Sequence, residues 1–493
     1  MKSLPINACE PISHEAACEK KDEVAVVRFL GEGSAKESLK QLFLGRATRS
    51  GAFYSPYLTE TTIDIDNLIH EALTHLTPPT TKDLYSQQGC PRKRCKSKKQ
   101  KSKAKLRSKA QRKQKQKGKS IALSRSEAEL QAYIRQNRTT HFEDAESVNG
   151  TVDTSSLPAS SPGYLGKIND LEREEEGLLP EHREYSLAEL VDQRSFEVIR
   201  YEKGKTKYVR SKDTEQIMAS IIPGPHGDVD DPTWKPVHEG VTHTVETLAP
   251  SCRFNWNSEE QRQGVVNGLN YGILLGNGQQ RPMLLSDQGK QNLRVLEQFM
   301  LCVFVQRLAG WMSVCFLTWA PRLFMYYVHI MGLLLEHHTG LRLPFDNCIF
   351  AAFTINFGPR TVCLPHRDSK NLAFGRCAIT ALGKYDHTKG GHLVLWDLKK
   401  VIEFPPGCTI FIPSAVLCHF NTPIGAHETR YSFTMYTSGG IFRWVEHGFR
   451  FEYLYKRSSD AVHDAALNAQ RWALGLSLFS TMSELMSPAN LEV

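Results

Sequence analysis

The sequence lacks several features that mark common classes of protein. Its 12 cysteines are scattered singly, and no pair has the CxxC spacing. This pattern argues against a structural zinc site and favours free thiols in a reducing compartment. The first residues, MKSLPINACEPISHEAACEKK, contain no apolar core of a secretory signal. We therefore expect a protein that is not secreted.

No apolar run is long enough to predict a membrane span. The most apolar stretch, residues 299–335, is interrupted by Gln306, Arg307, Pro321 and Arg322. These interruptions come before any run reaches the ~20 residues that a spanning helix needs. We interpret the stretch as buried helices and expect no membrane association.

Acidic residues are absent from one long segment. Residues 92–119 hold 16 Lys or Arg, whereas the whole chain has a net charge of +8, which leaves −8 (+8 minus 16) elsewhere. Such a low-complexity basic segment should not fold alone. It could bind the phosphates of a nucleic acid and serve as a nuclear import signal, or it could be a solubilising tail. The expected location is nuclear, otherwise cytoplasmic.

At 493 residues the chain exceeds what one core usually organises. Residues 1–90 contain only short apolar islands and form a poorly defined region. Residues 91–165 combine the basic low-complexity segment with a linker rich in Ser, Thr, Gly and Pro. We predict a catalytic domain with supporting helices over 166–455 and a C-terminal helix and tail over 456–493.

Within the predicted domain, helical patterns precede strand patterns. Apolar residues at helical spacing predict one buried face over 293–304 and a second helix between Pro321 and Gly340. The segment SFEVIRYEKGKTKYVR predicts a hairpin that turns at Gly204. Short strands then follow between turn residues, as CAITALGKY, HLVLWDL, VIEF, CTIFIPS and RYSFTMYT. This order predicts an α+β fold, a jelly-roll or barrel core braced by helices and preceded by a largely disordered basic N-terminal region.

The tripeptide His366-Arg367-Asp368 places two metal ligands two residues apart. Residues i and i+2 of an extended segment point to the same side, so both side chains can reach one ion. His419, which follows the CTIFIPS strand, is the candidate third ligand. Two histidines and one carboxylate form the facial arrangement that holds non-haem Fe(II) with open positions.

A cosubstrate residue follows on the next strand. Arg430 lies eleven residues after His419, and its planar guanidinium suits the far carboxylate of 2-oxoglutarate. Ligand identity alone would also allow a zinc hydrolase, and Arg430 is the feature that favours the oxygenase. His427 is a rival ligand in a turn, whereas His387 is expected to face solvent. Because Ala373 stands where a kinase needs asparagine, the HRD tripeptide is not a kinase loop.

These residues resemble the TET/JBP family of Fe(II)- and 2-oxoglutarate-dependent dioxygenases, most closely the Tet-like proteins of basidiomycete fungi. The resemblance covers roughly residues 255–455. Its matching pieces are GNGQQRP at 276–282, HRDSKN at 366–371, GGHLVLWDL at 390–398, CHF at 418–420, RYS at 430–432 and YTSGGIFRWVEHGF at 436–449. It implies a double-stranded β-helix fold with Fe(II), 2-oxoglutarate and O₂ as cofactor and cosubstrates.

The resemblance also implies roles for further residues. Ser432 would join Arg430 at the far carboxylate, and His392 would lie at the cosubstrate, although it could equally be a core histidine. Asn371 would contact the substrate base, with a turn asparagine as the alternative. Tyr436 would stack on a flipped base or simply belong to the barrel wall.

One position departs from the family. Members that act on 5-methylcytosine carry a base-contacting histidine eight residues after the arginine, where this chain has Ser438. The expected function is therefore oxidation of a methyl group in DNA, on 5-methylcytosine or N6-methyladenine. The alternatives are hydroxylation of a protein or small molecule on the same fold, and a non-catalytic nucleic-acid-binding protein.

Overall fold

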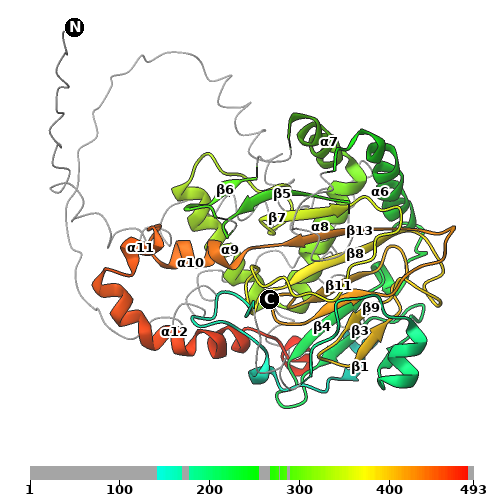
Figure 1. Cartoon of the computed structure of the whole chain (residues 1–493), viewed down its shortest axis with the longest axis horizontal. Helices are drawn as coiled ribbons and strands as arrows, with labels where there is room; N and C mark the ends of the chain where they lie inside the picture. The colour runs from blue at the N-terminus through cyan, green and yellow to red at the C-terminus, as the bar shows by residue number, and fades with distance from the viewer. Residues whose placement is uncertain (1–141, 169–176, 255–266, 277, 286–288, 487–493) are drawn as a thin grey trace, which may run out of the picture.

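The computed structural model describes residues 142–168, 177–254, 267–276, 278–285 and 289–486. The expectations for residues 1–90 and for the basic segment at 92–119 therefore lie outside the described residues. Two β-sheets form the centre of the described part, and helices surround them (Figure 1). This arrangement confirms the predicted α+β fold class with a jelly-roll core.

The larger sheet has nine strands in the order β1-β3-β4-β11-β8-β13-β7-β5-β6. Its central neighbours are antiparallel, as a jelly roll requires. The strands are β1 (Glu146–Asn149), β3 (Lys207–Arg210), β4 (Ile217–Ile222), β5 (Gly268–Leu274), β6 (Met283–Leu284), β7 (Ala352–Asn356), β8 (Cys377–Lys384), β11 (Thr409–Ile412) and β13 (Thr429–Tyr436).

The smaller sheet has four strands in the order β12-β9-β10-β2. Its strands are β2 (Glu197–Ile199), β9 (Leu393–Leu395), β10 (Lys400–Ile402) and β12 (His419–Asn421). From β8 onwards the chain alternates between the sheets, with β9 and β10 in the smaller, β11 in the larger, β12 in the smaller and β13 in the larger. The strand patterns from 377 to 437 were thus predicted correctly.

The expected hairpin around Gly204 was wrong. Gly204 does occupy a turn, with φ +82, but the strands on either side of it join different sheets. β2 pairs in parallel with β10, whereas β3 pairs with β1 and β4. Alternation in sequence specifies extended backbone, but it does not specify which sheet receives the strand.

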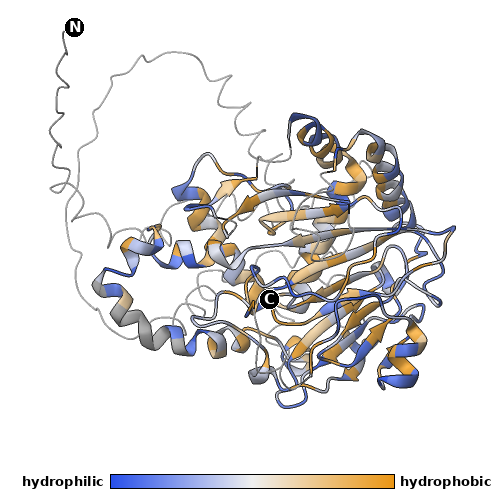
Figure 2. Ribbon diagram, in the orientation of Figure 1, coloured by the Kyte–Doolittle hydropathy of each residue, from blue (hydrophilic) through white to orange (hydrophobic). Residues whose placement is uncertain are grey.

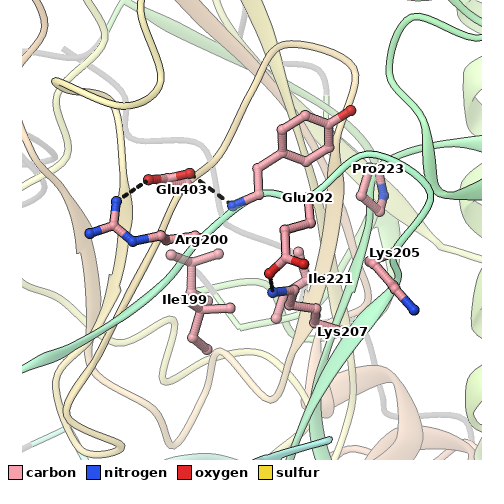
Figure 3. Close-up of a pocket in the computed structure, with 10 residues that line it drawn as sticks. Ile199, Arg200, Glu202, Lys205, Lys207, Ile221, Pro223 and Glu403 are labelled. Carbon is pink, nitrogen blue, oxygen red and sulfur yellow. Dashed lines mark hydrogen bonds and ion pairs between the residues drawn. The ribbon is translucent and has the colours of Figure 1, made fainter. Parts of the chain in front are cut away.

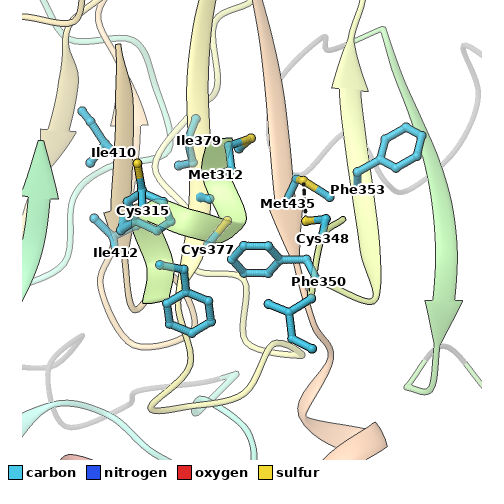
Figure 4. Close-up of a cluster of buried hydrophobic side chains, with 14 of the residues drawn as sticks. Met312, Cys315, Cys348, Phe350, Phe353, Cys377, Ile379, Ile410, Ile412 and Met435 are labelled. Carbon is cyan, nitrogen blue, oxygen red and sulfur yellow. Dashed lines mark hydrogen bonds between the residues drawn. The ribbon is translucent and has the colours of Figure 1, made fainter. Parts of the chain in front are cut away.

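Helices cover one face of the larger sheet. They are α6 (Lys235–Leu248), α7 (Gly289–Leu301), α8 (Val303–Trp319) and α9 (Pro321–His337). Phe299 of α7 packs against Phe353 and Phe433, and Phe316 of α8 stacks on Phe350 with ring centroids 5.2 Å apart. Sulfur-containing side chains from α8, β8 and β13 fill the same layer (Figure 4). Each large apolar side chain buried here stabilises the fold by about 1.5–3 kcal/mol.

The helical face predicted over 293–304 is broken in the structure. α7 and α8 are bent by 73° around Cys302, whose backbone is extended. Val303 and Phe304 are consequently 66% and 38% exposed rather than buried. In the described part of the chain no single helix is long and apolar enough to cross a membrane, although this bent pair passes that test together. α8 and α9 are largely buried, as expected from the sequence.

The C-terminal part forms α10 (Gly439–Glu446), α11 (Glu452–Tyr455), α12 (Ser459–Ser477) and α13 (Met482–Met486). The C-terminal helix expected within 456–493 is thus interrupted before α13. The break has a clear cause, because Ser480 accepts a hydrogen bond from Ile217 and Thr481 pairs with Gln216 at the edge of β4. In Figure 2 apolar residues concentrate on the strands and on the helix faces that meet them.

Candidate metal and cosubstrate site

The chain brings His366, Asp368 and His419 together. Their ligand atoms all lie within 4.8 Å of one another, and among the described residues they are the group of His, Cys, Asp or Glu side chains that could hold a metal ion. Nε2 of each histidine is 3.8 Å from a different oxygen of Asp368. His427 lies in an exposed turn outside this group, so the structure favours His419 as third ligand.

Backbone pairing positions the two histidines. His366 and His419 exchange hydrogen bonds of 3.2 and 2.9 Å as an antiparallel bridge, which sets the 366 segment beside β12. The backbone N–H of Asp368 donates to the carbonyl of Ser414 at 3.0 Å. The carboxylate of Asp368 is 24% exposed, so the metal face opens towards solvent on this side.

Each histidine is oriented by its other ring nitrogen. Nδ1 of His366 donates to the carbonyl of Leu364 at 2.7 Å, and Nδ1 of His419 donates to Leu417 at 2.9 Å. In the neutral ring this arrangement leaves Nε2 of each histidine as the ligand atom, directed to Asp368, as metal ligation requires. Burial and the neighbouring His419 lower the pKa of His366 to about 4, so it stays neutral near pH 7.

Strand β13 carries Arg430 and Ser432, the two residues expected at the far carboxylate of the cosubstrate. Successive residues of a strand point to opposite faces, and Phe433 and Met435 pack towards α7 and Cys348. Arg430, Ser432 and Tyr436 share the other face. The sequence pattern RYSFTMYT therefore separates a core face from a site face on one strand.

Arg430 is buried, with 1% of its surface exposed, and no Asp or Glu of the described residues pairs with it. Nη1 donates to the carbonyl of Thr361 at 3.1 Å, whereas Nε is buried without a partner. Burial raises the pKa of the Tyr385 hydroxyl to about 12, and the nearby positive charge of Arg430 opposes this rise. The hydroxyl itself donates to the carbonyl of Phe404. A buried cation without an anion is costly, so this site suits an incoming carboxylate. Sequence reasoning missed Tyr385, which directly follows β8.

His392 is also oriented for an anion. It is completely buried just before β9, and its Nε2 has no hydrogen-bond partner. Thr422 Oγ1 accepts the backbone N–H of His392 and lies 2.8 Å from Nδ1. A hydroxyl that donates to Nδ1 places the ring proton on Nε2, ready to donate to a carboxylate. Burial, together with neighbouring His387 and Arg430, lowers the pKa of His392 to about 4.

Ser432 lies beside Arg430, with 4% of its surface exposed. Its hydroxyl accepts a hydrogen bond of 2.8 Å from Nδ2 of Asn356 and keeps its own hydrogen to donate. Together, the donor set fits the expected cofactors: three ligand atoms for Fe(II), and Arg430, Ser432 and His392 for the carboxylates of 2-oxoglutarate.

The two expected substrate residues lie near the metal face. Asn371 is half-buried, and its Nδ2 donates to Ser414 Oγ at 3.2 Å, which leaves Oδ1 as a free acceptor. Tyr436 is half-buried at the end of β13, where burial and nearby Asp368 raise the pKa of its hydroxyl. Ser438, the position that departs from the family, is 4% exposed and accepts the backbone N–H of Leu275. Its hydroxyl therefore has a structural partner.

A segment ahead of residue 166 packs against the metal loop. Gly166 donates to the carbonyl of Ser369 at 2.9 Å, and Ala373 donates to the carbonyl of Tyr164 at 3.0 Å. The tyrosine ring is fully buried, and its hydroxyl donates to Glu446. The ordered contacts of the site thus begin upstream of the boundary that sequence composition suggested.

A separate surface hollow lies between the β2–β3 connection and the end of β10 (Figure 3). Its charges pair locally, because Glu403 accepts the backbone N–H of Tyr201 at 2.8 Å and lies 3.5 Å from Arg200. His387 is near this hollow, 3.9 Å from Glu403 and packed on the ring of Tyr201. Its side chain is only 25% exposed, so the expectation that it faces solvent was largely wrong.

The solved structures that match this chain in part include the following three. NgTET1 in complex with 5mC DNA is 13% identical, with a TM-score of 0.32, over 51% of this chain and 87% of that chain. The viral collagen prolyl hydroxylase vCPH from Paramecium Bursaria Chlorella virus-1, as its 2OG complex, is 17% identical, with a TM-score of 0.15. The match covers 17% of this chain and 57% of that chain. An oxidoreductase of the 2OG-Fe(II) oxygenase family from Burkholderia pseudomallei is 16% identical, with a TM-score of 0.23. The match covers 40% of this chain and 77% of that chain. Neither a protein-family model nor a curated protein sequence matches the chain. The function is therefore argued from the site itself.

Proposed function

We propose that this chain is an Fe(II)- and 2-oxoglutarate-dependent dioxygenase. The proposal is carried by the presence, in one fold, of a group that could hold a metal and of a buried cation without an anionic partner among the described residues. A face of two histidines and a carboxylate lies open at one end. At the other end, the buried Arg430 has no carboxylate partner among the described residues. A zinc hydrolase would use the first centre but has no need of the second.

Each side chain then has a defined task. His366, Asp368 and His419 hold the metal, and Arg430 binds the far carboxylate of 2-oxoglutarate through its planar fork. His392, which is completely buried, donates from Nε2 to a carboxylate of the cosubstrate. Iron bound here, with 2-oxoglutarate and O₂, supplies the oxidation of a C–H bond, and the chain provides orientation and exclusion of competing reactions.

For the substrate, we propose a methylated nucleobase in DNA. Asn371 offers an acceptor beside the metal face, which matches an exocyclic N–H of cytosine or adenine. Tyr436 offers an aromatic ring near Asp368. A methyl group inside a duplex stack is out of reach, so the base must be flipped out. The basic residues 92–119 would add phosphate binding and nuclear import.

The test uses the full chain with Fe(II), 2-oxoglutarate and duplexes that carry either 5-methylcytosine or N6-methyladenine. Nucleoside mass spectrometry should show loss of one methylated base, together with stoichiometric succinate. Asp368→Asn should abolish both signals. Asp144→Asn, at an exposed turn, is the matched control and should leave them unchanged.

The outcomes separate the oxygenase from its substrate. Succinate release that depends on Asp368, without change in either base, would overturn the nucleic-acid substrate and support a hydroxylase of another substrate. Binding of DNA without any turnover of 2-oxoglutarate would overturn the enzyme proposal. It would support a non-catalytic nucleic-acid-binding protein instead.

A further inference from the structure

Asp397 is a buried carboxylate that the proposed chemistry does not use. It follows β9 by two residues, and its side chain is 0% exposed. Burying a carboxylate is costly unless it is paired and hydrogen-bonded. The partners of Asp397 therefore indicate why the fold keeps a charge at this position.

The two oxygens of Asp397 contact the two segments that carry the metal ligands. Oδ1 accepts from Nη2 of Arg367 at 3.3 Å, and Arg367 stands between His366 and Asp368. Oδ2 accepts the backbone N–H of Cys418 at 2.6 Å, and Cys418 directly precedes His419. One side chain thus joins the HxD segment to the strand that supplies the third ligand.

The backbone N–H of Cys418 donates to the side chain of Asp397 rather than to a backbone carbonyl. The carbonyl of Cys418 accepts the N–H of Trp396 at 2.9 Å, so both backbone groups of Cys418 are held by residues 396–397. The ring of His419 is oriented by the carbonyl of Leu417, on the other side of Cys418. A shift of Cys418 would therefore move both the backbone and the ring orientation of His419.

The charge of Arg367 gives a second reason for the pairing. Its side chain is only 10% exposed, and it lies between two ligands of a divalent cation. An uncompensated guanidinium there would repel the metal, and the repulsion is stronger away from water. Arg367 points to the opposite side of the extended segment from His366 and Asp368, and there Asp397 neutralises its charge.

We propose that the buried Arg367–Asp397 pair is a positioning element for the metal site, in which Asp397 sets the geometry of His419 and compensates the charge of Arg367. The inference rests on the metal-binding part of the proposed function. Residues that orient metal ligands from behind typically change metal affinity about 10–100-fold when they are replaced.

The test measures Mn(II) affinity, with Mn(II) as a redox-stable probe, by titration calorimetry and electron paramagnetic resonance on the full chain. Asp397→Asn keeps the shape and an acceptor for Cys418 but removes the charge. We expect the Kd for Mn(II) to rise about 10-fold or more. The double variant Arg367→Met/Asp397→Asn removes both charges, and it should regain most of the affinity because no cation remains unpaired.

The matched control is Glu197→Gln. It also removes the anionic partner of a buried cation, Lys400, which is 3% exposed and lies in the same small sheet. This variant should lose thermal stability but keep the Mn(II) affinity of the wild type. Equal affinity in Asp397→Asn and wild type, or an equal loss in Glu197→Gln, would overturn the positioning role. If Asp368→Asn binds Mn(II) as tightly as the wild type does, the proposed metal site itself would be overturned.

Discussion

Replacing Arg430 with methionine separates the binding of 2-oxoglutarate from the stability of the fold. Two charge-assisted hydrogen bonds to a carboxylate contribute about 1.5–3 kcal/mol each. Their loss should weaken 2-oxoglutarate binding by about 3 kcal/mol or more, which is at least ~100-fold in affinity.

The protein without cosubstrate should respond differently. Arg430→Met loses the hydrogen bond to the carbonyl of Thr361, at about 1 kcal/mol. It also removes a buried cation that has no anionic partner among the described residues, which offsets that loss by a similar or larger amount. We expect the free energy of unfolding to stay within about 2 kcal/mol of the wild type.

The assay is thermal unfolding with and without 2-oxoglutarate, in the presence of Mn(II). A ligand at 100 times its Kd stabilises the native state by about 2.7 kcal/mol, so the wild type should gain several degrees and Arg430→Met should gain none. Arg376→Met is the matched control, because Arg376 is also buried and donates to the backbone carbonyl of Met218. Cosubstrate stabilisation that persists in Arg430→Met, or disappears equally in Arg376→Met, would refute the assignment.

Three further outcomes are expected. His392→Leu should raise the KM for 2-oxoglutarate by about 10-fold, since one hydrogen bond to a charged group is lost; an unchanged KM would make it a core histidine. Burial is the first cause that lowers the pKa values of His392 and His447 to about 4. The unfolded state then binds more protons between pH 6.5 and 4, so urea unfolding should show a loss of roughly 1 kcal/mol per histidine at pH 5.5 relative to pH 7.5. Gly383→Ala should destabilise more than Gly204→Ala in the same measurement. Both have positive φ, but only at Gly383 would a Cβ lie 2.2 Å from the carbonyl oxygen of Thr429.

Local patterns were sufficient to predict the group of His366, Asp368 and His419 that the fold brings together, and most of the strands. His366 and Asp368 are two residues apart, and the alternation around Arg430 lies within one strand. Both signals depend on residues that are close in sequence, where backbone geometry decides which side chains share a face. The same reasoning failed for the hairpin at Gly204 and for the helix that bends at Cys302, because tertiary packing decided both.

The Arg367–Asp397 pair shows why the rest of the site was not predictable. The two residues are 30 positions apart, and an aspartate after a strand ordinarily indicates a turn. Only the alternation of the chain between the two sheets brings Asp397 beside the ligand segments. Likewise, Tyr385 follows a strand like any barrel-wall tyrosine, and nothing in the sequence marks its place near the charge of Arg430.

The division of the site between two sheets explains how the chain sets the distance from metal to cosubstrate carboxylate. His419 begins β12 in the smaller sheet, whereas Arg430 is on β13 in the larger one. The turn that joins them is fixed by Glu428, whose carboxylate accepts the backbone N–H groups of Gly425 and Asp386, each at 2.7 Å. Glu428 thus links the β12–β13 connection to the β8–β9 connection, which leads to His392. Because one carboxylate bonds both connections, a movement of His392 relative to the β12–β13 connection would break one of these two hydrogen bonds.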